Sequence, residues 1–319
     1  MFKPGYDGTM EKRSFKEVFS DTMEKLLAED EKVVYLDCDL MNSFGTGSLP
    51  GKYPDRAIDC GIQEANMIGV AAGMAVEGRK PYCHTFGVFA SRRCFDQVFL
   101  SVGYADTSVR IIGSDPGICA MYNGGTHMPF EDIALYRSIP GAAIFEPCDT
   151  VQLEAILRGT KDRSGVTYIR SQRKVAVKVY DSFEYQCGKA NVLADGNDVA
   201  LFAVGIMVAE AMKARELLEL EGIHAAVIDL VSIKPLDEDT VLSYAKKCRV
   251  AVTCENSNIR GGVYAAVSEC LAAGCAVPVE AVGVFDVYGE VGTYDYLKEH
   301  YRLTAAEIVK KAKMAAARR

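Results

Sequence analysis

The stretch DCGIQEANMIGVAAGMAVEG, residues 59–78, carries the strongest structural signal in the sequence. A strand end leads into a tight turn at Gly61, and the segment from Met67 to Val76 is apolar on nearly every face of a helix. Such a helix must be buried. Glu64 lies one helical turn before Met67, so its carboxylate would begin a buried helix. Because a buried charge is costly unless it is paired or protonated, Glu64 is a candidate proton-transfer group.

Short strand-like runs alternate with helical stretches along the chain, for example in residues 33–39 and 109–115. This alternation predicts an α/β fold with a mainly parallel sheet. Between residues 174 and 197 the sequence becomes polar and irregular, and a second α/β series follows. Because 319 residues exceed the usual size of one domain, we predict two domains, residues 1–185 and 186–319.

Composition excludes several classes of protein. Hydrophobic residues make up 49% of the chain and charged residues 25%, which is typical of a soluble globular protein. The net charge of -7 and the scattered lysines and arginines argue against nucleic acid as a partner. No apolar run approaches the roughly 18 to 20 residues of a membrane span, and the N-terminus lacks a signal-peptide core. We therefore expect no membrane partner and a cytoplasmic location.

Cysteine and histidine usage points the same way. The eleven cysteines form an odd number, contain no CxxC motif and mostly sit in apolar segments, which predicts buried free thiols in a reducing compartment. The four histidines form no cluster with each other or with cysteines. We therefore expect no metal site built from this chain alone.

Three further segments carry side chains that could build a binding site. Phe86 and Phe89 follow a predicted strand, where they could form an aromatic wall over a flat ligand. An Asn-Gly-Gly step, which permits positive φ angles, comes just before His127 and could bring that imidazole into a cleft. Arg170, Arg173 and Lys174 end another strand, and the planar fork of arginine suits a phosphate.

Each signal also has an ordinary structural interpretation. Glu64 could be exposed in the first turn of its helix, stabilised by the helix dipole. Phe86 and Phe89 could be core packing, His127 a surface side chain on a turn, and the two arginines a solvated strand end. None of these signals decides the function by itself.

The order and spacing of the motifs are more specific than any one of them. Four motifs resemble the pyrimidine-binding domain of the transketolase family: GIQEANM, HTFGVF, GGTHMPFEDIALYRSIPG and YIRSQR. Three later ones are similar to the C-terminal domain of that family: VSIKPLD, VTCENSNIRGGVYAAV and VGVFDVYGEVGTYDYLKE. The resemblance runs from about Arg13 to Ala305 and covers both predicted domains.

The resemblance implies a thiamine-diphosphate-binding pyrimidine-type parallel-sheet domain followed by a transketolase C-terminal α/β domain. It implies transfer of a two-carbon glycolaldehyde unit from a ketose to an aldose, with thiamine diphosphate as cofactor. Glu64 matches the family glutamate that hydrogen-bonds N1′ of the aminopyrimidine. Phe86 and Phe89 match residues that flank this ring.

The resemblance also implies a substrate site. His127 matches a histidine that bonds the C1 hydroxyl or carbonyl of the donor sugar, and Arg13 and Arg173 match positions that grip a sugar phosphate. Two positions depart from the family pattern: Asn123 replaces an aspartate that contacts substrate hydroxyls, and Asp115 replaces a substrate histidine. We therefore expect a changed donor or acceptor, such as an unusual phosphorylated or otherwise anionic sugar.

One part of a complete transketolase is missing from the pattern. The family's diphosphate-binding domain carries a GDG motif and a distal asparagine that hold Mg²⁺ and the diphosphate, and the sequence has no such motif. The resemblance thus implies the C-terminal subunit of a split transketolase, which needs a separate N-terminal subunit. We expect the chain to dimerise within an α2β2 assembly, with Mg²⁺ bound mainly by the partner.

Three alternatives stay open. The chain could be the β subunit of a 2-oxo acid dehydrogenase E1 component, or a relative of deoxyxylulose-phosphate synthase, which Asp115 favours. The GGTH loop and the pair Arg170 and Arg173 favour transketolase over the E1 subunit, and the synthase family normally forms one long chain. A non-catalytic scaffold subunit is the third alternative, and the intact Glu64 argues against it.

Overall fold

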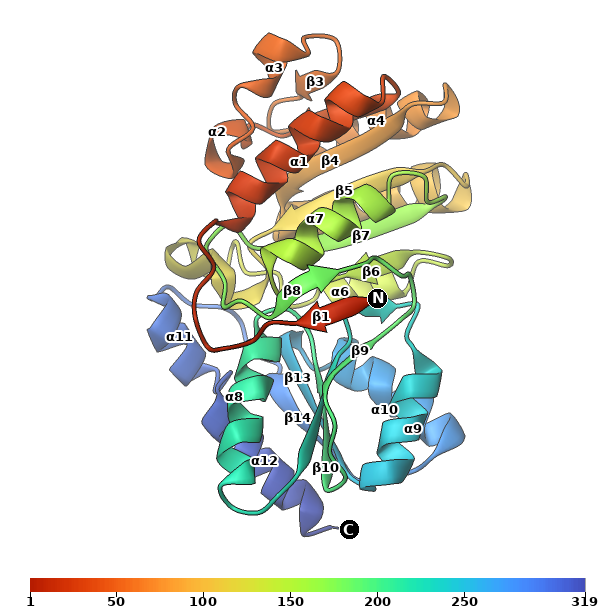
Figure 1. The fold of residues 1–319 in the computed structure, drawn as a ribbon. Coiled ribbons are helices and arrows are strands. Elements are labelled where there is room, and N and C mark those ends of the chain that lie inside the picture. The colour runs from red at the N-terminus through yellow and green to blue at the C-terminus, as the bar shows by residue number, and fades with distance from the viewer. Residues whose placement is uncertain (319) are drawn as a thin grey trace.

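Two sheets, each with helices on both faces, are stacked along the long axis of the molecule (Figure 1). The computed structural model describes residues 1–318, so residue 319 of the second predicted domain lies outside the described part. The predicted α/β class with two mainly parallel sheets is confirmed. The boundary between residues 185 and 186 remains a prediction, and one short strand of the second predicted domain belongs to the first sheet. This strand, β12 (Ser232–Lys234), pairs antiparallel with β6 (Ala143–Phe145) of the first sheet.

The first sheet contains seven strands, and all neighbouring pairs except the one with β12 are parallel. Their spatial order is β12, β6, β7 (Val166–Ser171), β5 (Val109–Ser114), β4 (Lys80–Phe86), β2 (Val33–Asp37) and β3 (Ala57–Asp59). Every residue of β2, β5 and β7 is buried. This explains their strand-like apolar runs, because parallel strands are covered by helices on both faces.

Helices α1 (Phe15–Glu29) and α7 (Thr150–Gly159) pack together on one face of this sheet. The other face is covered by α4 (Glu64–Val76) and the π-helical segments η1 (Phe89–Arg93) and η2 (Val98–Tyr104). Shorter elements complete the domain: α2 (Met41–Phe44), α3 (Leu49–Lys52), α5 (Phe95–Gln97), α6 (Asp132–Arg137), the 3₁₀ segment η3 (Gly117–Asn123), and a two-stranded antiparallel sheet of β1 (Phe2–Pro4) and β8 (Tyr180–Phe183).

Helix α4 differs from the expectation of complete burial. It buries the side facing β4, including Met67 and Ile68. Val70 on its other side is 38% exposed and Val76 is 72% exposed. The sequence of the helix is apolar all round, but the elements of this chain cover only one side of it.

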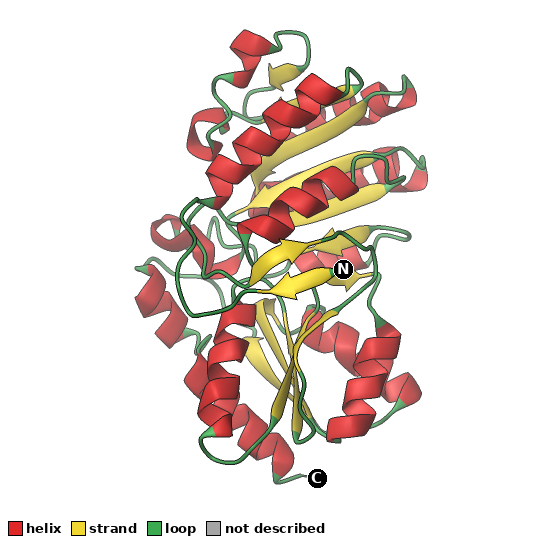
Figure 2. Cartoon of the chain, viewed as in Figure 1, coloured by secondary structure: helices red, strands yellow, loops and turns green. Residues whose placement is uncertain are grey.

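The second sheet repeats the pattern on a smaller scale, with helices on both sides of its strands (Figure 2). Its order is β14 (Val279–Val284), β13 (Ala251–Asn258), β10 (Val199–Ala203), β11 (Ala225–Asp229) and β9 (Asn191–Ala194), with only β9 antiparallel. Helices α8 (Met207–Glu219) and α12 (Ala305–Ala316) pack together, as do α9 (Glu238–Cys248) and α10 (Val263–Gly274), while α11 (Tyr294–His300) contacts η3.

All eleven cysteines are free thiols, and most of them are buried, as the sequence predicted. Among residues 1–318, no helix combines the length and the hydrophobicity that a bilayer crossing requires.

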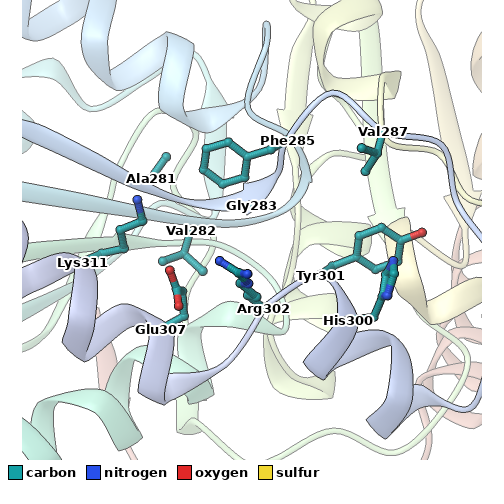
Figure 3. Close-up of a pocket in the computed structure, with 10 residues that line it drawn as sticks. All are labelled: Ala281, Val282, Gly283, Phe285, Val287, His300, Tyr301, Arg302, Glu307 and Lys311. Carbon is teal, nitrogen blue, oxygen red and sulfur yellow. The ribbon is translucent and has the colours of Figure 1, made fainter.

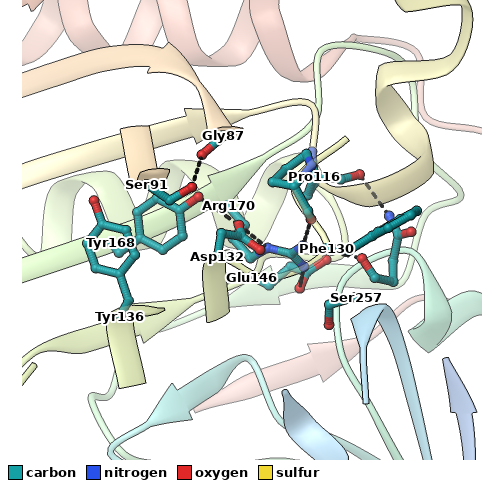
Figure 4. A network of polar contacts seen from close by, with 12 residues as sticks. Gly87, Ser91, Pro116, Phe130, Asp132, Tyr136, Glu146, Tyr168, Arg170 and Ser257 are labelled. Atoms are coloured by element: carbon teal, nitrogen blue, oxygen red, sulfur yellow. Dashed lines mark hydrogen bonds and ion pairs between the residues drawn. The ribbon is translucent and has the colours of Figure 1, made fainter. Parts of the chain in front are cut away.

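A buried ion network joins the two domains (Figure 4). Arg170, at the end of β7, has no exposed surface and pairs with Asp132 and Glu146. Its Nη2 donates to the carbonyl oxygens of Pro129 and of Asn256 in β13, each at 3.2 Å. The interpretation of Arg170 as a phosphate ligand or a solvated strand end is therefore wrong. Its donors are used inside the protein, where they connect the first sheet to the second.

We expect Arg170→Met to lower the free energy of unfolding by about 3–5 kcal/mol, because it leaves two carboxylates buried without their cation. Urea denaturation measures this loss. The control is Arg158→Met, which removes a partly exposed pair with Glu29 and should cost less than about 1 kcal/mol. Equal losses for the two variants would contradict the joining role of Arg170.

Candidate active site

Glu64 is the first residue of α4, and its carboxylate is buried. The chain leaves β3, turns at Gly61, whose φ of +68° favours glycine, and enters the helix three residues later. The residue is 2% exposed. Its two carboxylate oxygens accept hydrogen bonds of 2.9 and 2.8 Å from Nη1 of Arg93, and Oε1 also accepts one of 3.2 Å from the hydroxyl of Thr85. The solvent-exposed interpretation of Glu64 is excluded.

Arg93 is a site residue that the sequence analysis missed. It ends η1, and its Cζ lies 3.7 Å from the centroid of the Phe89 ring. The side chain is 43% exposed, so it reaches from the surface to the buried carboxylate. A buried Glu64 needs a cation, and Arg93 stands four residues after Phe89 in the sequence, so this partner could have been sought there.

Three aromatic rings meet beside this ion pair. Phe86 ends β4 and Phe89 begins η1, and their ring centroids are 6.2 Å apart. The ring of His127 meets both edge to face, at 5.4 and 5.3 Å. Both phenylalanines are partly exposed, so they do not serve as core packing alone. The structure thus brings together Glu64, Phe86, Phe89 and His127, which the sequence places far apart.

The loop that carries His127 is fixed by its two glycines. Gly124 has a φ of +72°, and a Cβ on Gly125 would lie 2.3 Å from the carbonyl oxygen of Gly289. Any other residue at position 125 would therefore collide with the second domain. The Asn-Gly-Gly step is required because the loop packs directly against this backbone.

His127 has an imidazole whose pKa lies below its usual value of 6.5. Burial is the main cause; the carboxylate of Asp115 opposes it and the cation of Arg93 adds to it. The ring is therefore neutral at pH 7 and presents one N–H and one acceptor nitrogen. Nδ1 lies 2.8 Å from the hydroxyl of Thr126.

Asp115 and Arg173 form a second ion pair behind the rings. Asp115 follows β5 with a φ of +57° and is 2% exposed. Nε of Arg173 donates to Oδ1 of Asp115 at 2.9 Å, Nη2 lies 2.5 Å from Oδ2 as part of the ion pair, and Nη1 donates to Ser43. Burial raises the pKa of Asp115, although Arg173 opposes this effect. Cζ of Arg173 lies 5.3 Å from the Phe86 ring, so this pair adjoins the aromatic cluster.

A pocket of about 470 Å³ opens beside Arg173. Its lining includes the polar residues Ser14, Lys16, Ser43, Asn123, Arg173 and Lys174. Backbone bonds from Phe15 and Lys16 to the carbonyl oxygens of Lys174 and Arg173 hold the start of α1 against this segment. Within residues 1–318, neither Lys16 nor Lys174 makes an ion pair. The sequence analysis did not single out Lys16, because it is an ordinary surface position on a helix.

Arg13 stands apart from this group. It pairs with Asp21 on α1 and lines a neighbouring pocket with Ser20 and Gly45. Lys16 lines both pockets. The structure therefore places Arg13 near the predicted substrate residues but does not bring it into contact with Arg173.

The structure has two other pockets of note, one next to this site and one away from it. One of about 730 Å³ lies between the domains and shares Arg173 and Lys174 with the pocket already described. Another, of about 400 Å³, lies in the second domain between β14 and α12 and includes Phe285, Arg302 and Lys311 (Figure 3). The latter contains none of the predicted site residues.

The residues present fit the cofactor implied by the sequence. A buried carboxylate beside two partly exposed aromatic rings suits a flat nitrogen heterocycle, which needs a hydrogen-bonding partner and apolar faces. In this chain, Glu64, Phe86 and Phe89 are the residues that would hold its aminopyrimidine ring.

Comparison with known families agrees with both domains. Residues 11–177 match the transketolase pyrimidine-binding domain, and residues 188–308 match the transketolase C-terminal domain. The 6-deoxy-6-sulfo-D-fructose transketolase subunit SqwH of Clostridium sp. (strain MSTE9) is 46% identical over 96% of each chain. Human transketolase is 31% identical over 82% of this chain and 42% of its own length.

A solved structure is also similar over nearly the full length. It is described as a split gene transketolase in an inactive beta4 tetramer, and it superposes with a TM-score of 0.88 at 34% identity. The match covers 96% of this chain and 98% of the other.

The surroundings of His127 give a titration test. We expect its NMR titration midpoint to lie below 6.5, because burial disfavours the imidazolium. Asp115→Asn should lower the midpoint further, since it removes the carboxylate that stabilises the charged ring. His127→Gln identifies the signal by its disappearance. A midpoint above 6.5, or an upward shift in Asp115→Asn, would contradict this account of the electrostatics.

Proposed function

This chain belongs to the transketolase family, and from that premise we propose that it is the C-terminal subunit of a split transketolase. The observation that carries the proposal is the buried carboxylate of Glu64 beside Phe86, Phe89 and His127. In this proposal the chain binds the aminopyrimidine end of thiamine diphosphate. A separate N-terminal subunit binds the diphosphate and Mg²⁺.

The cofactor and the protein divide the chemistry between them. Thiamine diphosphate, when bound, supplies a carbanion and electron sink for moving a glycolaldehyde unit from a ketose to an aldose. Glu64 shares a proton with N1′ of the aminopyrimidine, a role that suits a carboxyl kept away from water. Phe86 and Phe89 flank the ring and exclude water from it.

His127 faces the donor sugar in this proposal. Its ring touches both phenylalanines, and its lowered pKa keeps it neutral at pH 7. A neutral imidazole can donate one hydrogen bond and accept another, which matches a C1 hydroxyl or carbonyl oxygen. It also adds no positive charge beside the buried carboxylate.

We propose an anionic ketose as donor, with 6-deoxy-6-sulfo-D-fructose as the leading candidate. The relative at 46% identity is a subunit for that sugar, and a cationic pocket lies beside the aromatic cluster. Asp115 already forms an ion pair with Arg173 and accepts a hydrogen bond from its Nε, so much of the charge of this arginine is compensated. Lys16 and Lys174 supply the uncompensated charge that attracts a sulfonate or phosphate. Asn123 contributes an amide at the same pocket.

In this proposal the cofactor site is divided between two subunits, so the chain must associate with the N-terminal subunit. Helix α4, which begins with Glu64, has an exposed apolar side with Val70 and Val76 that suits a protein contact. We propose that the chain dimerises and joins two N-terminal subunits in an α2β2 enzyme. Its free buried thiols fit a reducing compartment, so we place the enzyme in the cytoplasm.

Reconstitution with the N-terminal subunit tests this function. We expect turnover of 6-deoxy-6-sulfo-D-fructose with an aldose acceptor only when both subunits, Mg²⁺ and thiamine diphosphate are present. Glu64→Gln should lower kcat by about 10²-fold or more, because the proton at N1′ loses its partner. Glu31→Gln, which removes an exposed carboxylate between α1 and β2, is the control and should keep full activity.

Three outcomes would overturn the proposal. Full activity in Glu64→Gln would remove the carboxylate from catalysis. Turnover of pyruvate in place of ketoses would favour a synthase of deoxyxylulose phosphate or a 2-oxo acid dehydrogenase. A wild-type complex that never turns over would favour the scaffold alternative.

The cationic pocket gives a separate prediction. Lys174→Gln should raise KM for the sulfonated donor about tenfold and leave kcat nearly unchanged, because one charge-assisted contact to the far end of the sugar is lost. The control is Lys12→Gln, which removes an exposed lysine just before α1. This lysine lines neither of the two pockets near Lys16, so KM should not change. An unchanged KM in Lys174→Gln would exclude this pocket as the anion site.

A further inference from the structure

One side chain occupies two contacts that the aminopyrimidine needs. Nη1 of Arg93 donates to both carboxylate oxygens of Glu64, at 2.9 and 2.8 Å. The same guanidinium lies over the Phe89 ring, with Cζ 3.7 Å from the centroid. A flat ring that bonds Glu64 and stacks on Phe89 would therefore meet Arg93 at both points.

We infer that Arg93 is a positioning residue that holds Glu64 in place and is displaced from it when the aminopyrimidine binds. The inference rests on the proposed function, because it needs the ring at Glu64. The guanidinium imitates such a ring: it is planar, it carries N–H donors, and it packs on an aromatic face. Without cofactor, the guanidinium therefore contacts the same two groups that the ring would contact, the Glu64 carboxylate and the Phe89 ring.

Burial makes a substitute for the ring necessary. Glu64 is 2% exposed, and its carboxylate would be strongly destabilised without a partner. Thr85 supplies only one hydrogen bond, of 3.2 Å, to one of the two oxygens. Arg93 compensates the charge and keeps the carboxylate at the start of α4 until a ring nitrogen takes over.

The backbone of η1 is held while the Arg93 side chain can leave. The hydroxyl of Ser91 donates to the carbonyl oxygen of Gly87 at 2.7 Å, as Figure 4 shows, and that of Tyr136 donates to Ala90 at 2.7 Å. The Arg93 side chain is 43% exposed, and within the described residues its only ion pair is the one with Glu64. A side-chain rotation therefore suffices to release the carboxylate without moving Phe89.

The inference predicts that Arg93 and the aminopyrimidine compete for Glu64, which can be measured through the affinity for thiamine diphosphate. If Arg93 must leave, the apparent Kd for thiamine diphosphate equals the intrinsic Kd divided by the fraction of molecules in which Arg93 does not cover the site. In the reconstituted complex with Mg²⁺, Arg93→Gln should therefore bind thiamine diphosphate roughly three- to tenfold more tightly than wild type by calorimetry. Arg93→Lys keeps the charge but lacks the planar fork, so it should fall between the two.

Thermal unfolding of the isolated chain provides a second readout. Without cofactor, Arg93→Gln should unfold at a lower temperature than wild type, because Glu64 loses its cation. In a Glu64→Gln background the same substitution should change little. The control is Arg92→Gln, which removes the neighbouring arginine and its 2.9 Å pair with Glu131. It should leave the cofactor Kd unchanged.

The binding result decides between the two proposals. Equal or weaker cofactor binding in Arg93→Gln and Arg93→Lys, with wild type binding normally, would overturn the displacement and leave the proposed function intact. If Arg93→Gln does not fold, the comparison of Arg93→Lys with wild type decides by the same criterion. A wild-type complex that binds no thiamine diphosphate would overturn both proposals.

Discussion

The site depends on one constraint: a carboxylate at position 64 is buried, and its charge must be compensated. The surrounding residues meet this requirement in layers. Arg93 and Thr85 contact the oxygens directly, and Phe89 covers the guanidinium of Arg93. His127, kept neutral at pH 7, contacts the same rings without adding charge. A group that exchanges protons with a ring nitrogen is useful only if its environment is controlled in this way.

Polar contacts between the two domains fix the positions of the segments that carry the site residues. Arg170 ties the end of β7 to the backbone of Asn256 in β13. The side chain of Asn256 in turn accepts from the amide of Ile118 and donates to the carbonyl oxygen of Pro116, so it fixes the start of η3. The loop from η3 to His127 then packs on Gly289. The second domain therefore shapes the site by holding this loop, although none of the predicted site residues comes from it.

Within residues 1–318, the charged side chains are paired at one end of the site and unpaired at the other. At one end Glu64 and Arg93 compensate each other within a partly enclosed space. In the middle, Asp115 compensates Arg173, which also lies near the Phe86 ring. Beyond it, Lys16 and Lys174 line an open pocket without anionic partners in the described chain. A substrate with a reacting carbonyl at one end and an anionic group at the other matches this order, as an anionic ketose does.

The sequence by itself determined the α/β class and the two series of elements, and its resemblance to transketolases predicted Glu64, Phe86, Phe89 and His127 as site residues. Periodic apolar runs, a glycine turn and an out-of-place carboxyl are local signals, and they survive in any arrangement of the elements. Only the tertiary structure decided which charges meet. It paired Glu64 with Arg93, buried Arg170 between domains, separated Arg13 from Arg173 and placed Lys16 beside Lys174. Such pairings join residues tens to more than a hundred positions apart, and a linear pattern contains no information on which distant side chains packing will bring within hydrogen-bonding reach.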